Sequence, residues 1–467
     1  MRTSTRLAES TALQGAALLV TGLAFGGLYA YSASRLSPWL LPAMIVAALS
    51  VAIAYQRPEI GIALALVLIP MGTLGINPQL MTYAVQAFSV YLACIAFLGW
   101  RARGEEASAL PRMAPLVLIY LAVALLSVTQ SPELHSASRF MRSLLTGGLL
   151  FSAVIFTVRS RREILWVLAG AAVSGLIVGL HAIRDYSSGE HAAGFITTTG
   201  EVVGRATAGF SQPNQLGGFL VLLVPLGIAG ALISPRWRIP FAFAAAAAAA
   251  GVYASFSRGA LIGLAIVPFF FLRGWRLWIL GPLVVLAVVL AAPGLVRERF
   301  ATLTSSGGEI STRVDIWHTA LNIWENHPVL GVGLGGFPQA YEQALVPGKM
   351  FLPATIFQPP PHAHNIFLQL MAEQGILGLL AFVAILIAAV RCTARLRRSS
   401  DRSARLLGSG LLAALAAFLI HNLFDVTFED PQTGLYVFVL FGLIAASDLL
   451  YRDRPSPVSL PPVSLPT

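Results

Sequence analysis

The chain has 467 residues, of which 56% are hydrophobic and only 11% are charged, and its formal net charge is +10. A soluble domain carries about 25% charged residues, so this composition excludes an ordinary soluble protein. With only two cysteines, Cys94 and Cys392, the chain has neither a disulfide framework nor a cysteine-based metal site.

Runs of about 20 apolar residues recur along nearly the whole chain and predict transmembrane helices. The predicted fold class is therefore all-α, a polytopic membrane protein of about 12–14 spans. The first run is longer than the core of a signal peptide, so we interpret it as a retained span. The candidate spans are 11–31, 38–55, 60–76, 80–100, 113–129, 140–158, 163–183, 213–233, 239–256, 259–273, 276–292, 364–391, 405–424 and 433–451.

The distribution of basic residues predicts the orientation of these spans. If the N-terminus is cytoplasmic, about two thirds of the 31 Lys and Arg residues fall in cytoplasmic loops and termini, as the positive-inside rule requires. Both termini are then cytoplasmic. The chain divides into about eleven spans in 1–292, a long outer loop in 293–363, about three spans in 364–451, and a Pro-rich tail in 452–467 that we expect to be disordered.

The outer loop is predicted to contain one amphipathic helix, over 311–326, which Pro328 ends. Four apolar residues at helical spacing line one face of it, and we expect that face to lie on the membrane surface or on the tops of the spans. These residues are Val314, Trp317, Leu321 and Trp324. Arg313 falls in the first turn, where the free N–H groups favour an anion, so it is a candidate phosphate ligand; a structural pair with Asp315 or Glu325 is the alternative.

A glycine cluster, GVGLGG at 331–336, formally contains G-x-G-x-x-G. No predicted strand precedes it and no βαβ unit fits there, so it does not indicate a dinucleotide site. We expect it to let the chain turn sharply after the surface helix.

Two histidines, His362 and His364, come directly before a span together with Asn365. A histidine at the membrane surface is well suited to take a proton from a hydroxyl near neutral pH. The alternative is an interfacial pair hydrogen-bonded to lipid headgroups. No third metal ligand is evident nearby, so no metal is expected.

Several polar residues are predicted on the same side of the membrane. Arg205 precedes Asn214, which opens a span, and Arg258 lies between two spans. His421 and Asp425 are one helical turn apart at the outer end of another span. Arginine at a span end can simply reach to headgroups. If Arg205, Arg258, Arg313 and His364 converge, however, the set suits a membrane-bound pyrophosphate, because each Arg can hold phosphate oxygens bidentately.

Three segments together resemble the signature of the O-antigen ligase and polymerase family: SRGALIGL, STRVDIWHTALNIWENHPVLGVGLGGF and HAHNIFLQLMAEQGILGLL. The shared pattern is an Arg before a Trp-containing surface helix, then P-x-x-G-x-G, then H-N opening a span, then E-x-G-x-x-G, which starts at Glu373. The resemblance implies an inverting glycosyltransferase of the bacterial inner membrane, with its active site facing the periplasm. It takes a glycan from undecaprenyl diphosphate and needs no nucleotide sugar, cofactor or metal.

By that resemblance, His364 or else His362 deprotonates the acceptor hydroxyl, and Arg258 and Arg313 hold the diphosphate, with Arg205 as a third contact. Asn365, Asn214 and Glu373 are supporting residues. Three acceptors remain open, namely lipid A–core (a ligase, which we favour), a growing glycan (a polymerase) or a protein hydroxyl. A flippase or transporter is the alternative from another class, but it predicts charges in the middle of the spans, and these spans have almost none. The expected partners are glycan lipids and membrane lipids, and no nucleic acid.

Overall fold

The computed structural model describes residues 40–104, 110–189, 193–197, 199–272, 294–301, 309–344 and 362–452. The predicted spans 11–31 and 276–292 and the Pro-rich tail after Arg452 lie outside these residues. The chain separates into two units, Met1–Arg57 and Pro58–Thr467. Helix α2 (Leu40–Gln56) belongs to the first unit, and all that follows concerns the second.

In its described residues, the second unit is helical apart from one short hairpin. Its apolar helices are α3 (Pro58–Leu68) with the 3-10 turn η2 (Ile69–Leu74), α4 (Pro78–Ala102), α5 (Ala114–Ser127) with η4 (Val128–Gln130), α6 (Leu134–Thr157), α7 (Arg161–Ser188), α8 (Pro213–Ile233), α9 (Arg238–Ser255), α10 (Arg258–Phe271), α15 (Ile366–Arg398), α16 (Arg402–Asn422) and α17 (Pro431–Arg452). Eight of the described helices are long and apolar enough to cross a membrane. The predicted class, an all-helical polytopic membrane protein, is confirmed.

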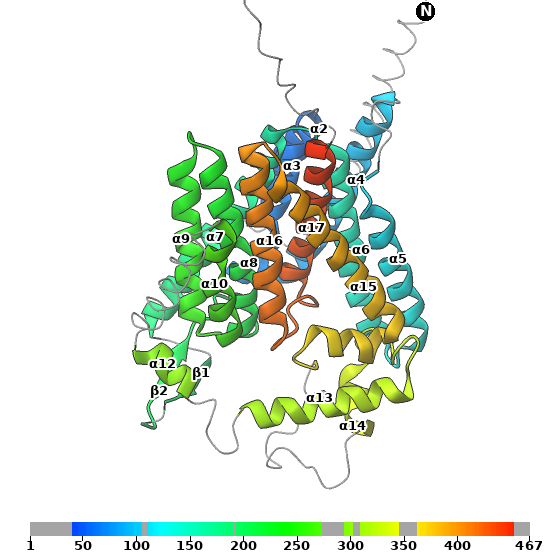
Figure 1. Cartoon of the computed structure of the whole chain (residues 1–467), viewed down its shortest axis with the longest axis vertical. Coiled ribbons are helices and arrows are strands. Elements are labelled where there is room, and N and C mark those ends of the chain that lie inside the picture. The colour runs from blue at the N-terminus through cyan, green and yellow to red at the C-terminus, as the bar shows by residue number, and fades with distance from the viewer. Residues whose placement is uncertain are drawn as a thin grey trace, which may run out of the picture. The chain divides into compact units, whose positions relative to one another are not determined.

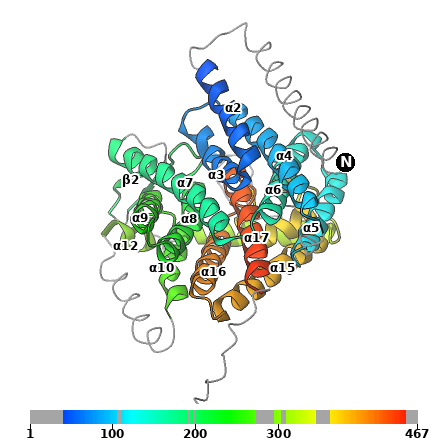
Figure 2. The ribbon, with the colours of Figure 1, turned by 90° about the horizontal axis from the view of Figure 1, so that it is seen from above.

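Helices α8 and α17 form the centre of the bundle, and almost every residue of each is buried. Seen from above, α7, α9, α10 and α16 surround α8, while α6 and α15 flank α17 (Figure 2). Small residues let these helices approach closely, as expected where helices pack in lipid. A Cβ on Gly179 of α7 would lie only 2.4 Å from the carbonyl oxygen of Ala247 on α9.

The connecting elements gather at one end of the bundle (Figure 1). They are α12 (Gly294–Ala301), α13 (Glu309–Asn326), α14 (Phe337–Ala344) and the hairpin of β1 (Ala193–Ile196) and β2 (Val202–Arg205). The hairpin is antiparallel and pairs Ala193 with Arg205. The sequence analysis placed this segment in an outer loop and predicted no strands there.

Helix α13 lies across the end of the bundle beside the start of α15 (Figure 1). The face that it buries carries Ile316, Ala320 and Ile323, which form a cluster with Ala363 and Ala372. This is not the face that the apolar spacing singled out. In the predicted stripe, Val314 is exposed and Trp317 is half-buried, and the predicted contact of this stripe with the membrane surface or the tops of the spans stays a prediction.

Near its N-terminal end, α15 is broken at Gly375, whose backbone (φ 64°, ψ −166°) is not helical. Such a break frees backbone groups that find no water inside a membrane. The loop after α13 satisfies them through four hydrogen bonds: Val332 N to Ala372 O (2.9 Å), Gly333 N to Glu373 O (3.0 Å), Ile376 N to Pro328 O (2.8 Å) and Leu377 N to Val329 O (3.4 Å). The loop and the break therefore form one structural unit.

This unit explains the residue types of the two glycine motifs. A Cβ on Gly375 would lie 2.2 Å from the carbonyl oxygen of Val329. Gly331, Gly333 and Gly335 all have positive φ, which favours glycine, so the predicted sharp turn is present. The Glu373 carboxylate adds two bonds, accepting the N–H of Gly335 (2.9 Å) and of Phe337 (3.1 Å).

Candidate active site

The histidine segment enters α15 through Asn365, which caps the helix. The Asn365 side-chain oxygen accepts the N–H groups of Phe367 (2.9 Å) and Leu368 (3.2 Å), as a good N-cap does. Its amide nitrogen donates to the Leu423 carbonyl (3.2 Å), beyond the end of α16. Asn365 thus ties the start of α15 to the loop that links α16 to α17.

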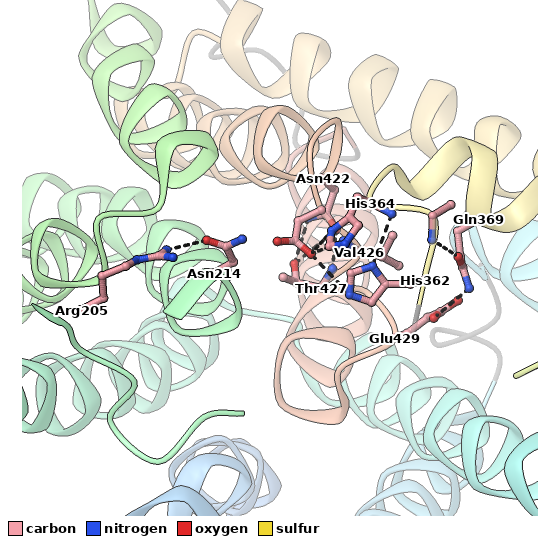
Figure 3. Close-up of polar contacts among 11 residues, drawn as sticks. Arg205, Asn214, His362, His364, Gln369, Asn422, Val426, Thr427 and Glu429 are labelled. Carbon is pink, nitrogen blue, oxygen red and sulfur yellow. Dashed lines mark hydrogen bonds and ion pairs between the residues drawn. The ribbon is translucent and has the colours of Figure 1, made fainter. Parts of the chain in front are cut away.

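His362 and His364 meet a carboxylate on that loop, Asp425 (Figure 3). The His362 Nε2 atom lies 3.7 Å and the His364 Nδ1 atom 3.8 Å from the same oxygen, Oδ1. Both distances exceed a hydrogen bond, and catalytic contacts commonly tighten when substrate binds. The two imidazole rings are 4.3 Å apart, edge to face. The sequence analysis noted Asp425 but gave it no role.

One backbone bond distinguishes the two histidines. His362 Nδ1 accepts the N–H of His364 (3.3 Å), so the hydrogen of neutral His362 belongs on Nε2, facing Asp425. His364 turns Nδ1 toward Asp425, and no described residue hydrogen-bonds its Nε2. The His364 backbone is left-handed (φ 50°), an uncommon conformation outside glycine that marks functional positions.

Burial of the His362 side chain affects its protonation state. It lowers the pKa of His362 to about 4, although Asp425 opposes this, and the nearby charges of His364 and Arg313 lower it further. His362 is therefore neutral at physiological pH and keeps its Nε2 hydrogen. The side chain of His364 is 20% exposed, against 10% for His362, although its Nδ1 atom is buried.

Asp425 itself is buried, and one of its oxygens, Oδ1, accepts the N–H of Val426 (2.8 Å). Burial works against ionisation, but the interaction with His364 and the electrostatic influence of the other two histidines, His362 and His421, outweigh it, so the pKa of Asp425 lies well below its usual range. The second oxygen, Oδ2, has no hydrogen-bond partner among the described residues. Asp425 is thus a fixed negative charge with free acceptor capacity.

The predicted arginines lie on the neighbouring helices. Arg205, at the end of β2, is buried; its Nε donates to the Ser255 carbonyl (2.9 Å) and its Nη2 to the Asn214 side chain (2.7 Å; Figure 3). Arg258 opens α10, and its Nε donates to the carbonyl of Arg299 (2.7 Å). Both guanidinium groups are therefore held by backbone carbonyls.

Arg299 of α12 was missed by the sequence analysis. Its Nε donates back to the Phe256 carbonyl (3.3 Å), and its guanidinium lies over the Phe195 ring at 5.0 Å. Phe256 has a left-handed backbone (φ 46°) and joins α9 to α10. The bonds from Arg258 to Arg299 and from Arg299 to Phe256 thus stabilise this turn. An Arg in a loop gives no sequence signal for such a contact.

His421 connects the arginine side to the histidine cluster. It lies between α8 and α10, because a Cβ on Gly218 or on Gly259 would come within about 3 Å of its ring or backbone. Both ring nitrogens are buried and have no hydrogen-bond partner among the described residues. Arg313 approaches from α13 and acts electrostatically on both His362 and His421. The described contacts do not join Arg205 or Arg258 directly to His364.

A second buried polar pair adjoins the cluster. Gln369 of α15 accepts the N–H of Ala363 (2.8 Å) and donates to the Glu429 carboxylate (3.2 Å), so it joins the histidine segment to the α16–α17 loop (Figure 3). Burial and the nearby charge of Glu373 raise the pKa of Glu429 well above its usual range, against the Gln369 hydrogen bond.

The atoms of His362, His364 and Asp425 are close enough together to hold a metal ion, with their ligand atoms all within 4.8 Å of one another. The hydrogen bonds oppose this use. A neutral histidine that ligates through Nε2 must carry its hydrogen on Nδ1, yet Nδ1 of His362 accepts a backbone N–H. The donor set therefore fits a hydrogen-bonded cluster better than a metal centre.

Comparison with known families places these residues in context. Residues 243–383 match the family model of the O-antigen ligases. The matched segment contains Arg258, Arg313, His362, His364 and Glu373, and it leaves out Arg205 and Asp425. A comparison with curated proteins finds no match. The chain is thus a polytopic membrane protein with a segment that is similar to the O-antigen ligases.

Proposed function

We propose that the chain is an inverting glycosyltransferase that moves a glycan from undecaprenyl diphosphate to the lipid A–core, that is, an O-antigen ligase. The family match supports the reaction class. The observation that carries the mechanism is that His364 Nδ1 faces Asp425 at 3.8 Å, while no described residue hydrogen-bonds Nε2. This is how a catalytic base is oriented by a third group.

In this mechanism, His364 is the general base. Its Nε2 takes the proton of the acceptor hydroxyl as the oxygen attacks the anomeric carbon, and the bond from that carbon to the diphosphate oxygen breaks on the opposite side. Asp425 stabilises the imidazolium that forms. His362, neutral and bonded through Nδ1, turns its Nε2 hydrogen toward Asp425 at 3.7 Å. We therefore propose that His362 is a positioning residue and that His364 is the base.

The departing diphosphate needs positive charge that is already in place. Arg258 and Arg313 are the proposed ligands, with Arg205 as a third contact. The carbonyl bonds to Arg205 and Arg258 support this role, because they restrict each side chain, so that its charge is in position before the diphosphate departs. No metal enters this mechanism, since the charge of the leaving group is offset by arginine.

The orientation follows the charges at the two ends of α15. The helix begins beside the histidine cluster and ends with Arg395, Arg397 and Arg398 in its last turn. The positive-inside rule puts this basic end in the cytoplasm. We therefore propose that the cluster faces the periplasm of the bacterial inner membrane and that both termini are cytoplasmic.

An in vitro transfer assay tests the proposal. Purified protein receives an undecaprenyl-diphosphate-linked glycan, once alone and once with lipid A–core, in the presence of EDTA. A product that requires lipid A–core is the expected result. A ladder of lengthened lipid-linked chains without it would identify a polymerase instead. If donor is consumed in neither reaction, the proposed transferase is wrong, and transport of lipid-linked glycan becomes the function to test.

A further inference from the structure

The outer end of α6 carries a stripe of exposed basic residues that the proposed mechanism does not use. His135, Arg139 and Arg142 are spaced i, i+4, i+7, which puts all three on one face of the helix, and all three are exposed. Arg139 lies over the ring of Phe140 at 5.4 Å, and Arg142 Nη1 donates to the hydroxyl of Ser138 at 3.5 Å. We call these three residues the α6 stripe.

Within the described part of the chain, no carboxylate pairs with the stripe. The nearby Glu133 instead accepts a hydrogen bond from the Ser136 hydroxyl (3.0 Å). Like charges one turn apart on a helix repel each other, and Arg142 lies about 12 Å along α6 from its first residue. An exposed arginine at that depth of a span is costly unless an anion accompanies it. The stripe therefore fits a ligand that carries phosphate at the level of the lipid headgroups.

The stripe is on the same side of the bundle as the histidine cluster. Ser131, just before α6, donates its hydroxyl hydrogen to the Leu334 carbonyl (3.0 Å), and a Cβ on Gly335 would lie 3.0 Å from the Phe140 ring. The N–H of Gly335 bonds Glu373 of α15, the helix that His364 precedes. One packed loop thus separates the stripe from the start of α15.

The stripe also differs from the arginines of the candidate diphosphate site. Arg205 and Arg299 are buried, and Arg205, Arg258 and Arg299 each donate to a backbone carbonyl. The stripe lies on α6, which α17 separates from α8 (Figure 2). A donor lipid held by α8 and α10 therefore leaves α6 available for a second lipid.

We propose that the α6 stripe binds the phosphate groups of the acceptor, so that the acceptor is an anionic lipid anchored in the outer leaflet and its glycan reaches toward His364. This inference rests on the proposed transferase function and names the acceptor class that it uses. Charge complementarity is the reason for the choice, since phosphorylated lipid A–core has phosphates at its membrane anchor. Two charge-assisted contacts at an exposed site correspond to about a tenfold or larger change in affinity.

The test uses the full-length protein in neutral-lipid nanodiscs, with the double variant Arg139→Gln, Arg142→Gln. The matched control is Arg236→Gln, Arg238→Gln, which removes two exposed charges from the loop between α8 and α9. Transfer rates are measured against the concentration of lipid A–core, in its phosphorylated form and after phosphatase treatment. We expect the double variant to raise KM for the phosphorylated acceptor about tenfold and to leave kcat within about twofold, while the control changes neither.

Phosphatase treatment should raise the wild-type KM by a similar factor and should not affect the double variant further. An unchanged KM in the double variant would overturn the proposal. Dephosphorylation of the acceptor that raises the KM of the double variant further would overturn it too, because the two effects would then be independent. So would a wild-type KM that rises with added phosphatidylglycerol, because the stripe would then bind any anionic headgroup. Absence of donor consumption by the wild type is a different result, since it would refute the transferase function itself.

Discussion

The polar side chains around Asp425, the histidine region, are hydrogen-bonded differently from those around Arg205 and Arg258, the arginine region. Around Asp425, polar atoms are buried without full hydrogen bonding, including His364 Nδ1, Asp425 Oδ2 and both ring nitrogens of His421. Around Arg205 and Arg258, guanidinium groups are fixed by backbone carbonyls from α9 and α12. The histidine region therefore contains polar atoms that no described residue hydrogen-bonds, whereas the arginine region contains positive charges fixed by hydrogen bonds.

This difference matches what each step of the proposed reaction needs. A general base is neutral before it takes the proton and charged afterwards. Its neighbours must therefore be able to interact with both forms. A site for a leaving diphosphate works best when its positive charges are already in position, because no reorganisation is then needed during the reaction. Substitutions in the two regions should therefore produce effects of different size and kind.

The largest effect is expected from His364→Ala. Loss of a general base costs about 10²–10⁴ in rate, so we expect transfer to fall by about 10³-fold while the variant still inserts and folds. His362→Ala, the matched control, should fall by less, because His362 only holds Asp425. Initial rates of transfer at saturating donor measure both. A variant lacking His364 that keeps full activity would move the base to His362 or remove the mechanism.

A large loss of stability is expected from Gly375→Ala, which tests the scaffold of the histidine region. A Cβ at this position would overlap the Val329 carbonyl, and the backbone angles are accessible to glycine alone, so we expect a loss of about 3 kcal/mol. Thermal unfolding in detergent measures it. Gly99→Ala on α4 is the control, because its Cβ would meet only the end of Arg103, at 3.9 Å. Equal stability of the two variants would show that the break is not held by the loop.

In the arginine region, Arg258→Lys should reduce transfer by about 10–100-fold, since a lysine cannot both bond the Arg299 carbonyl and hold phosphate oxygens bidentately. Arg299→Lys should weaken donor binding by the same route, because it releases the Phe256 turn. The loss should appear mainly in KM for the donor. Wild-type kinetics in both variants would contradict the idea that this charge must be held in place.

The smallest effect concerns pH and the loop that carries Asp425. Loss of hydration raises the pKa of Asp430 to about 6, against hydrogen bonds from Thr433, and the charge of Asp425 adds to the rise. The folded state therefore binds this proton more tightly than the unfolded state. Its contribution to stability is complete below the ordinary carboxyl pKa and is lost as the pH rises through about 6.

Asp430→Asn removes that loss. We expect the variant to be more stable than the wild type by about 1–2 kcal/mol at pH 7.5 and to differ little at pH 4. Thermal unfolding at the two values measures the difference. A gain of the same size at both would mean that the proton of Asp430 is not responsible.

Most of the helices could be predicted because hydropathy is a local property. The run 213–233 coincides with α8, and the runs 239–256 and 405–424 lie within a few residues of α9 and α16. The face of α13 could not be predicted in this way. Spacing alone indicated the stripe that includes Val314 and Trp317, whereas the residues packed with Ala363 and Ala372 lie on another face. The hairpin was missed because its strands are only four residues long and gain their stability from pairing.

The candidate site divides in the same manner. The predicted site residues all lie at the end of the bundle that carries the connecting elements. They are Arg205, Arg258, Arg313, His362 and His364. The sequence could not rank the histidines, because the ranking depends on a backbone hydrogen bond and on Asp425, far along the chain. Arg299 was missed for the same reason, since its partner Phe256 lies in another element.

By itself, then, the sequence determined that this is a helical membrane protein with its polar chemistry gathered at one end, because burying charge in lipid is costly wherever it occurs. It also determined the glycines at which the chain can turn. Only the tertiary structure decided which histidine nitrogens face Asp425 and which backbone carbonyls the arginines bond. Those features depend on hydrogen bonds between distant residues, which are directional and short-ranged, so no local pattern records them.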